Sequence, residues 1–173
     1  QLQMAQAVRQ AIQDRRNLCV EAGTGTGKTL AYLIPTLSCG RRVIVSTATK
    51  NLQEQLFFKD IPLVRKHLLP NLAVTYMKGR QNYLCLKKFY GHSPEELLFG
   101  GVQDEWRSLS QWVRETGTGD RTELAWISDE DPFWRRLDAR SETCPGQKCT
   151  YFDQCFITRM RQKAAQSDLI VVN

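Results

Sequence analysis

Three stretches of the chain carry apolar residues at every third or fourth position, the spacing of one helical face. They are MAQAVRQAIQDR (residues 4–15), TLAYLIPTLSCG (residues 29–40) and KNLQEQLFFKDI (residues 50–61). The second stretch ends on Gly40, a residue that commonly closes a helix. It also contains Pro35, which we expect to kink or shorten the helix.

Short apolar runs alternate with these helices and predict strands. They are NLCVEA (residues 17–22), RRVIVST (residues 41–47), LAVTYM (residues 72–77) and DLIVVN (residues 168–173). NLCVEA reads as a short buried strand, so Cys19 within it, like Cys39 at the end of an apolar helix, is expected to be a small buried side chain. Alternation of strands and helices is typical of a parallel sheet with helices on both faces, an α/β fold.

The segment between the third and fourth predicted strands does not follow this alternation. Residues 95–114 predict a helix, whose apolar face would contain Leu97, Leu98, Trp106, Leu109 and Val113. ETGTGDRTE is a loop by its glycine content, and FITRMRQKAAQ predicts a basic helix. This part of the chain is therefore predicted to be an insertion in the α/β domain.

Composition and charge place the chain among globular proteins with an anionic partner. The chain is 42% hydrophobic and 24% charged, with a net charge of +6. Residues 61–94 contain six Lys or Arg and no acid, whereas residues 95–142 contain twelve acids, six Arg and all four Trp. A basic body around an acidic middle suggests two modules, although a basic run can also be a solvated face. No apolar run approaches the roughly 20 residues that span a bilayer, and the start lacks a signal-peptide core, so we expect a cytoplasmic protein.

EAGTGTGKT is the most specific motif in the chain. A glycine-rich turn between a strand and a helix directs successive backbone N–H groups at phosphate oxygens. The Lys28 ammonium is expected to reach the β- and γ-phosphates of ATP, and the Thr29 hydroxyl to bind Mg²⁺. The strict motif has glycine where this chain has Ala22, a residue small enough to be accepted. The predicted nucleotide-binding residues are Ala22, Gly23, Thr24, Gly25, Thr26, Gly27, Lys28 and Thr29.

A P-loop motor also needs an acid at a strand end to hold Mg²⁺. Asp129 and Glu130 in LAWISDE offer one only superficially, because they lie in the acidic insertion with no alternation of strands and helices around them. We interpret them as loop residues. The catalytic acid is therefore expected to be missing from this stretch of sequence.

The cysteines predict a metal site. Cys144, Cys149 and Cys155 follow one another in CPGQKCTYFDQC, and Cys85 opens the insertion that these three close. A disulfide is disfavoured in a reducing cytosol. Structural zinc prefers tighter pairs of cysteines. An iron–sulphur cluster is larger than one ion and tolerates wider spacing, so it is favoured over zinc.

Together these motifs resemble one family. EAGTGTGKT, VIVSTATKNLQEQL, KGRQNYLC, the three-cysteine stretch and DLIVVN, in this order, are similar to the first motor domain of DinG/XPD-type iron–sulphur helicases, and to their bacterial DinG/YoaA branch in particular. The resemblance covers essentially the whole chain. It implies a RecA-like fold interrupted by a mostly helical iron–sulphur domain, with the motor over residues 1–78 and 164–173 and the insertion over residues 79–163. The acidic DEAH motif, an arch domain and a second motor domain would lie beyond Asn173.

The resemblance also implies an activity and its cofactors. It implies an ATP-dependent 5′→3′ DNA helicase in repair or replication, with a [4Fe–4S] cluster on Cys85, Cys144, Cys149 and Cys155. Gln1 would read adenine. The whole protein would be a monomeric ATP hydrolase that uses Mg²⁺, acts on single-stranded or forked DNA and meets replication or repair proteins. The present stretch alone is expected to be inactive, because it lacks the acid and the facing domain.

DNA contacts are expected on two parts of the chain. Hydroxyl and basic side chains at a strand's carboxyl end could bind phosphates, and basic residues interleaved with aromatic ones suit single strands. The predicted DNA-binding residues are Thr47, Thr49, Lys50, Lys78, Arg80, Tyr83 and Lys87. The alternative for the aromatic residues is packing of the insertion. Two rival functions remain: a P-loop enzyme such as a kinase with a zinc insert, and a redox-sensing DNA-binding module.

Overall fold

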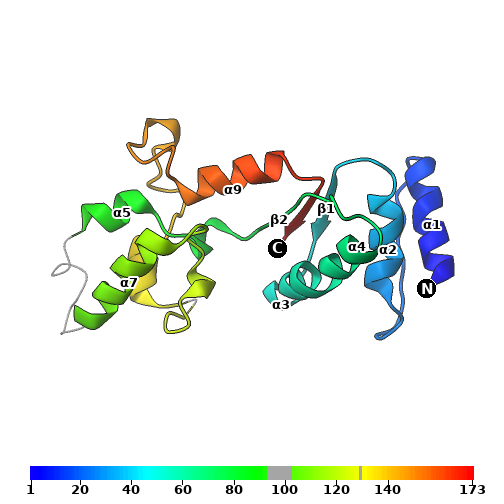
Figure 1. The fold of residues 1–173 in the computed structure, drawn as a ribbon, viewed down its shortest axis with the longest axis horizontal. Helices are drawn as coiled ribbons and strands as arrows, with labels where there is room; N and C mark the ends of the chain where they lie inside the picture. The colour runs from blue at the N-terminus through cyan, green and yellow to red at the C-terminus, as the bar shows by residue number, and fades with distance from the viewer. Residues whose placement is uncertain (93–102, 129) are drawn as a thin grey trace. The chain divides into compact units, whose positions relative to one another are not determined.

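The structure, a computed structural model, describes residues 1–92, 103–128 and 130–173 (Figure 1). The described chain divides into two compact units. The first contains residues 1–77 and 163–173, and the second contains residues 78–162. Because the first unit is built from two separate stretches, the second is inserted into it along the chain. No helix in the described residues is both long and apolar enough to cross a membrane.

The first unit contains a small parallel sheet and several helices, which confirms the α/β class. In chain order its elements are α1 (Leu2–Gln13), α2 (Lys28–Leu37), β1 (Val43–Ser46), α3 (Lys50–Gln55), a π-helical turn (Leu56–Asp60), α4 (Ile61–His67), β2 (Val74–Met77) and β3 (Leu169–Val172). Three predicted helices and three of the four predicted strands are therefore confirmed. Pro35 lies in the last turn of α2, and the helix continues past it to Leu37.

The sheet has the strand order β1-β3-β2, with both pairs parallel. Its register aligns Val43, Leu169 and Val74 across the three strands, and two residues further on Val45, Val171 and Tyr76. These six side chains pack against one hydrophobic cluster. Alternate residues of a strand point to opposite faces, so these six side chains lie on the same face of the sheet.

One face of the sheet carries the core of the first unit. Leu33 and Leu37 of α2 and Val64 of α4 pack there, in the same cluster as the strands. On the other face Ile44 is 65% exposed, whereas Ile170 and Thr75 beside it are buried, so that face is partly covered. The prediction of helices on both faces is confirmed for the face that carries this core.

The predicted buried strand NLCVEA is wrong. Residues 17–22 form no strand, Leu18 and Val20 are 45% and 40% exposed, and Cys19 is exposed rather than buried. Cys39 is half-buried. A strand forms only where its backbone pairs with a neighbouring strand, and residues 17–22 pair with none of the three strands of the described sheet. An apolar run alone does not supply that partner.

The second unit is mostly helical. Its elements are α5 (Leu86–Gly91), α7 (Gln103–Glu115), α8 (Pro132–Leu137) and α9 (Phe156–Ala165), the last of which leads back into the first unit, with short 3₁₀ turns at Arg80–Asn82, Arg121–Glu123 and Gly146–Lys148. Its core contains Phe89, Leu109, Trp134 and Phe156. The predicted basic helix is confirmed as α9, and LAWISDE forms no helix or strand in its described residues.

Helix α7 confirms the second half of the helix predicted over residues 95–114. Leu109 and Val113 are buried in the core, and Trp106 packs against it, as their spacing predicted. The first half of that prediction, with Leu97 and Leu98, lies outside the described residues.

The second unit depends on a glycine at position 119. Gly119 has φ +66°, and a Cβ built on it would lie 2.3 Å from Cδ2 of Phe156, which is buried. We expect Gly119→Ala to lower the free energy of unfolding by roughly 2–5 kcal/mol, because left-handed backbone and overpacking both cost energy. Urea unfolding followed by circular dichroism measures this change.

Gly117→Ala is the matched control. It lies in the same loop, at a glycine with no atom within 4 Å of an added Cβ. We expect this substitution to change the free energy of unfolding by no more than about 0.5 kcal/mol. Equal effects of the two substitutions would contradict the packing of Gly119 against Phe156.

Candidate functional site

The glycine-rich loop of the first unit leads directly into α2. Lys28 is the first residue of that helix, and Gly27 caps it with φ 74°. Inside the loop the Thr26 hydroxyl donates to the carbonyl of Gly23 over 2.9 Å. A left-handed glycine before a ten-residue helix gives the backbone turn that directs N–H groups at an anion.

The Lys28 side chain folds over this loop. Its ammonium donates to the carbonyl of Ala22 over 2.8 Å and also to that of Gly23. The charge is therefore held inside the curve of the loop, where phosphate oxygens would compete with the two carbonyls for it.

Two further side chains meet at the loop. The amide Nε2 of Gln1 donates to the carbonyl of Gly27 over 3.3 Å, which brings the predicted adenine reader to the P-loop. The Thr29 hydroxyl forms a hydrogen bond with Tyr32. Burial, and then the charge of nearby Asp60, raise the pKa of Tyr32, and the hydrogen bond from Thr29 offsets only part of this rise. The structure thus gathers Gln1, Lys28 and Thr29 at one end of α2.

Residues at the carboxyl end of β1 form a second polar group. The Thr49 hydroxyl caps α3 by accepting from the backbone N–H of Leu52 over 3.2 Å. The Thr47 hydroxyl donates to the carbonyls of Thr49 and Val172, each over 3.2 Å. Lys50 is the first residue of α3. The three predicted residues therefore lie at one strand end, although both hydroxyls already have partners within the protein.

Gln53 is a residue that the sequence did not reveal. It is fully buried, and its Nε2 donates to the carbonyls of Met77 and Val171 over 2.9 Å and 3.0 Å. It thereby ties α3 to the carboxyl ends of β2 and β3. Its Oε1 has no hydrogen-bond partner among the described residues. No sequence pattern marks this role, because it depends on the strand order.

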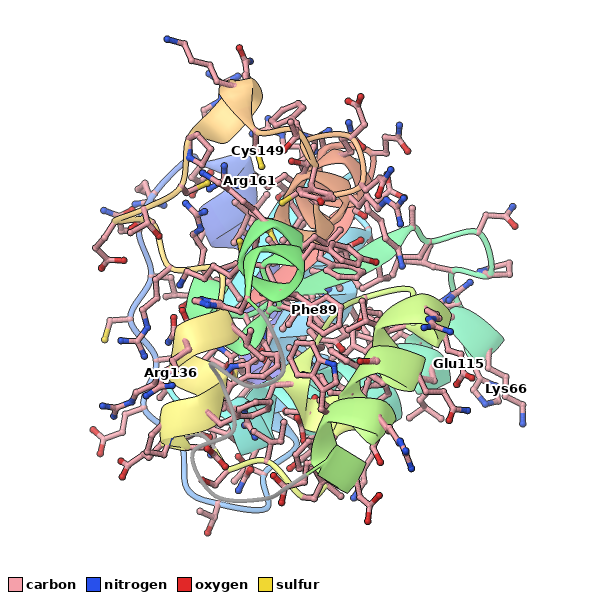
Figure 2. The ribbon with its side chains drawn as sticks, turned by 90° about the vertical axis from the view of Figure 1, so that its left-hand side faces the viewer. Lys66, Phe89, Glu115, Arg136, Cys149 and Arg161 are labelled. Atoms are coloured by element: carbon pink, nitrogen blue, oxygen red, sulfur yellow. The ribbon has the colours of Figure 1, made fainter. Side chains whose placement is uncertain are left out.

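The second unit contains a cavity of about 350 Å³ lined by the four predicted metal ligands. They are Cys85, Cys144, Cys149 and Cys155. Figure 2 shows Cys149 close to Arg161, which lines the same cavity. Cys19 and Cys39 belong to the first unit. All six cysteines are free thiols, so the disulfide alternative is not realised.

Backbone hydrogen bonds bring these four cysteines together. The N–H of Cys85 donates to the carbonyl of Leu137 over 2.8 Å, which fixes the start of α5 beside the end of α8. Three tight turns then fold the loop: the N–H groups of Cys149, Phe152 and Cys155 donate to residues three positions earlier over 3.0, 3.0 and 3.2 Å. Cysteines far apart in sequence thus face one space.

The cavity is electropositive. Its lining has no Asp or Glu among the described residues, and its basic members are Arg80, Lys87, Lys88, Arg140 and Arg161. Hydrogen bonds from the backbone N–H of Gly146, and then from Arg80, lower the pKa of the Cys144 thiol. The Arg80 Nε is a buried donor with no acceptor among the described residues. These features favour anionic sulphur at this place.

The structure shows no preformed metal site among the residues that it describes. In the described ranges no three His, Cys, Asp or Glu side chains come together closely enough to hold a metal ion. The four cysteines line one cavity of about 350 Å³ without meeting at one point.

Two of the predicted DNA-binding side chains are buried in the second unit. Lys78 Nζ lies 3.0 Å from Asp120 Oδ2, with 2% and 1% of these side chains exposed, and donates to the Thr122 hydroxyl over 3.0 Å. Tyr83 is 3% exposed, accepts from the backbone N–H of Lys78, and has a pKa raised to about 12, chiefly by burial. Their burial argues against direct contact with DNA. Arg80 is half-buried, and Lys87 is exposed.

The acidic pair in LAWISDE is only partly described by the structure. Glu130 lies in an exposed turn of the second unit, and Asp129 lies outside the described residues.

Known proteins with similar sequences identify the family. Residues 3–88 match the DEAD/DEAH box helicase family. The whole chain is similar to the ATP-dependent DNA helicase YoaA of Haemophilus influenzae (41% identical) and of Escherichia coli (39%), covering 27% of each. It is also 35% identical to the ATP-dependent helicase DinG of Mycobacterium tuberculosis, covering 29% of that protein. The chain thus spans less than a third of the length of these relatives. It belongs to the DEAD/DEAH box helicases, in the group of YoaA and DinG.

Proposed function

We propose that this chain is the nucleotide-binding part of an ATP-dependent DNA helicase. The observation that carries the proposal is the glycine-rich loop with the Lys28 ammonium inside it, in a chain similar over its whole length to proteins named ATP-dependent DNA helicases. In the proposed site the P-loop backbone and Lys28 bind the β- and γ-phosphates of ATP. Thr29 binds Mg²⁺, and Gln1 contacts adenine.

The second part of the proposal is a [4Fe–4S] cluster in the cysteine cavity. Four thiols that line one cavity, and the basic side chains of that lining, support it. Cys85, Cys144, Cys149 and Cys155 would hold the cluster. When bound, the cluster would link four separate points of the chain and so stabilise the second unit.

The third part concerns DNA. Thr47, Thr49 and Lys50 would contact the phosphate backbone at the end of β1, and Arg80 and Lys87 would do so on the second unit. We further propose 5′→3′ movement along single-stranded or forked DNA, by a cytoplasmic monomer that acts in repair or replication. The division of labour would be a RecA-like motor over residues 1–78 and 164–173, with an inserted cluster domain over residues 79–163.

The experiment compares ATP-driven unwinding of duplexes that carry a single-stranded tail at the 5′ or the 3′ end. It uses the full-length protein that contains this chain, because a P-loop motor also needs an acid and an arginine from a facing domain. We expect ATP hydrolysis that single-stranded DNA stimulates, and unwinding only with the 5′ tail. Hydrolysis without DNA stimulation would favour a different P-loop enzyme, and unwinding from the 3′ tail would overturn the polarity.

A further inference from the structure

Two tyrosines of the second unit stack on each other at its surface. The rings of Tyr90, in α5, and Tyr151, two residues after Cys149, have centroids 5.3 Å apart and planes inclined by 20°. Tyr151 lines the cysteine cavity, and Tyr90 is 56% exposed although one face of its ring is covered. A large aromatic surface therefore remains in water beside the cavity.

The core holds this pair in place. Phe89 is buried, and its ring meets that of Tyr90 edge-on, with centroids 5.0 Å apart and planes at 73°. Phe89 also stacks on Trp106 of α7, with ring centroids 5.0 Å apart and ring planes inclined by 18°. Figure 2 shows Phe89 in the interior beneath α5. Tyr90 is thus anchored to the core through a chain of packed rings.

Basic side chains accompany the pair. Lys87 precedes Tyr90 by three residues on α5, which places both on one face of that helix. Lys87 and Arg161 are exposed and line the cavity to which Tyr151 contributes. Neither forms an ion pair with an acid among the described residues. The neighbouring Lys88 and Arg140 are less available, because both contact Asp138.

We propose that Tyr90 and Tyr151 form a stacking platform for an unpaired base of single-stranded DNA, with Lys87 and Arg161 placed for the flanking phosphates. The inference rests on the proposed function, which makes DNA the partner. An exposed ring pair beside positive charge fits a nucleotide, which offers a flat π-face and an anion together. In a duplex the base faces are covered, so the platform selects an unpaired strand. Every base has such a face, so it selects no sequence.

The test measures binding of a fluorescent oligothymidylate, and of an abasic strand of equal length, to the full chain prepared without oxygen. We expect Tyr90→Ala to weaken oligothymidylate binding by about 5- to 100-fold, the range that loss of one base–aromatic contact gives, and to leave abasic binding unchanged. Tyr90→Trp keeps a ring and is expected to retain binding. Trp126→Ala, which removes an aromatic residue 41% exposed in the same unit, is the matched control.

A second measurement needs no substitution. A strand that contains 2-aminopurine should lose fluorescence when it binds the unaltered chain, because the base stacks on the tyrosines. If the chain binds DNA but Tyr90→Ala has no base-dependent effect, or fluorescence does not change, the platform is wrong and the helicase proposal stands. If the chain does not bind single-stranded DNA at all, the platform and the proposed DNA contacts of this chain both fall. Binding of Tyr90→Ala weakened equally for both strands would reduce the role of Tyr90 to packing.

Discussion

Lys28→Ala is expected to lower the affinity for Mg²⁺–ATP by roughly 10- to 100-fold, the change that follows from loss of a charge-assisted hydrogen bond. The structure places this ammonium inside the glycine-rich loop proposed to bind phosphate, where it already donates to the carbonyls of Ala22 and Gly23. Alanine keeps α2, because it is a good helix former at the first position of that helix. The loss should therefore appear in binding and leave the fold intact.

Isothermal titration with Mg²⁺–ATP measures the affinity, and circular dichroism checks the fold. Lys66→Ala is the matched control, because it removes an exposed lysine from α4 in the same unit, away from the loop (Figure 2). Equal nucleotide affinity of Lys28→Ala and the unaltered chain would remove this loop from the proposed site.

The second large effect is expected from the cysteines of the cavity. Replacement of Cys85, Cys144, Cys149 or Cys155 by serine should each abolish cluster binding and lower the melting temperature, because metal binding and folding are coupled. The four thiols line one cavity, so losing any one leaves the group with an incomplete set of ligands. The absorbance of the iron–sulphur chromophore and thermal unfolding measure both losses.

Cys19→Ser and Cys39→Ser are the controls for this series. Both cysteines belong to the first unit, and Cys19 is exposed there. Neither change should affect the chromophore. If all six substitutions had the same effect, or if only the loss of Cys19 mattered, the assignment of the cavity as the cluster site would be contradicted.

The fold could be predicted where local pattern and long-range pairing agree. VIVS and LIVV are apolar runs that also find neighbours in the sheet, so β1 and β3 appear where the sequence predicts them. The run around Leu18 and Val20 has the same local character but pairs with no described strand, and it is exposed. The hydrophobic pattern of a segment indicates its preference for strand, and backbone pairing with a neighbouring strand determines whether the strand forms.

The candidate site residues show the same difference between local and long-range information. The glycine-rich loop is a continuous stretch of sequence, so its residues could be predicted from their spacing alone. The buried pair of Lys78 and Asp120 joins residues distant in sequence, and nothing in the acid-free stretch around Lys78 reveals that partner. The stacking of Tyr90 on Tyr151 likewise depends on how the insertion folds. Charge along a sequence therefore overstates the basic surface available to an anionic partner.

Metal analysis of the chain, purified without oxygen, is the most direct test of an ATP-driven motor that carries an iron–sulphur cluster. A [4Fe–4S] cluster on the four cavity thiols predicts about four iron atoms and four acid-labile sulphides per chain. About one zinc per chain, with no iron and no sulphide, would contradict it.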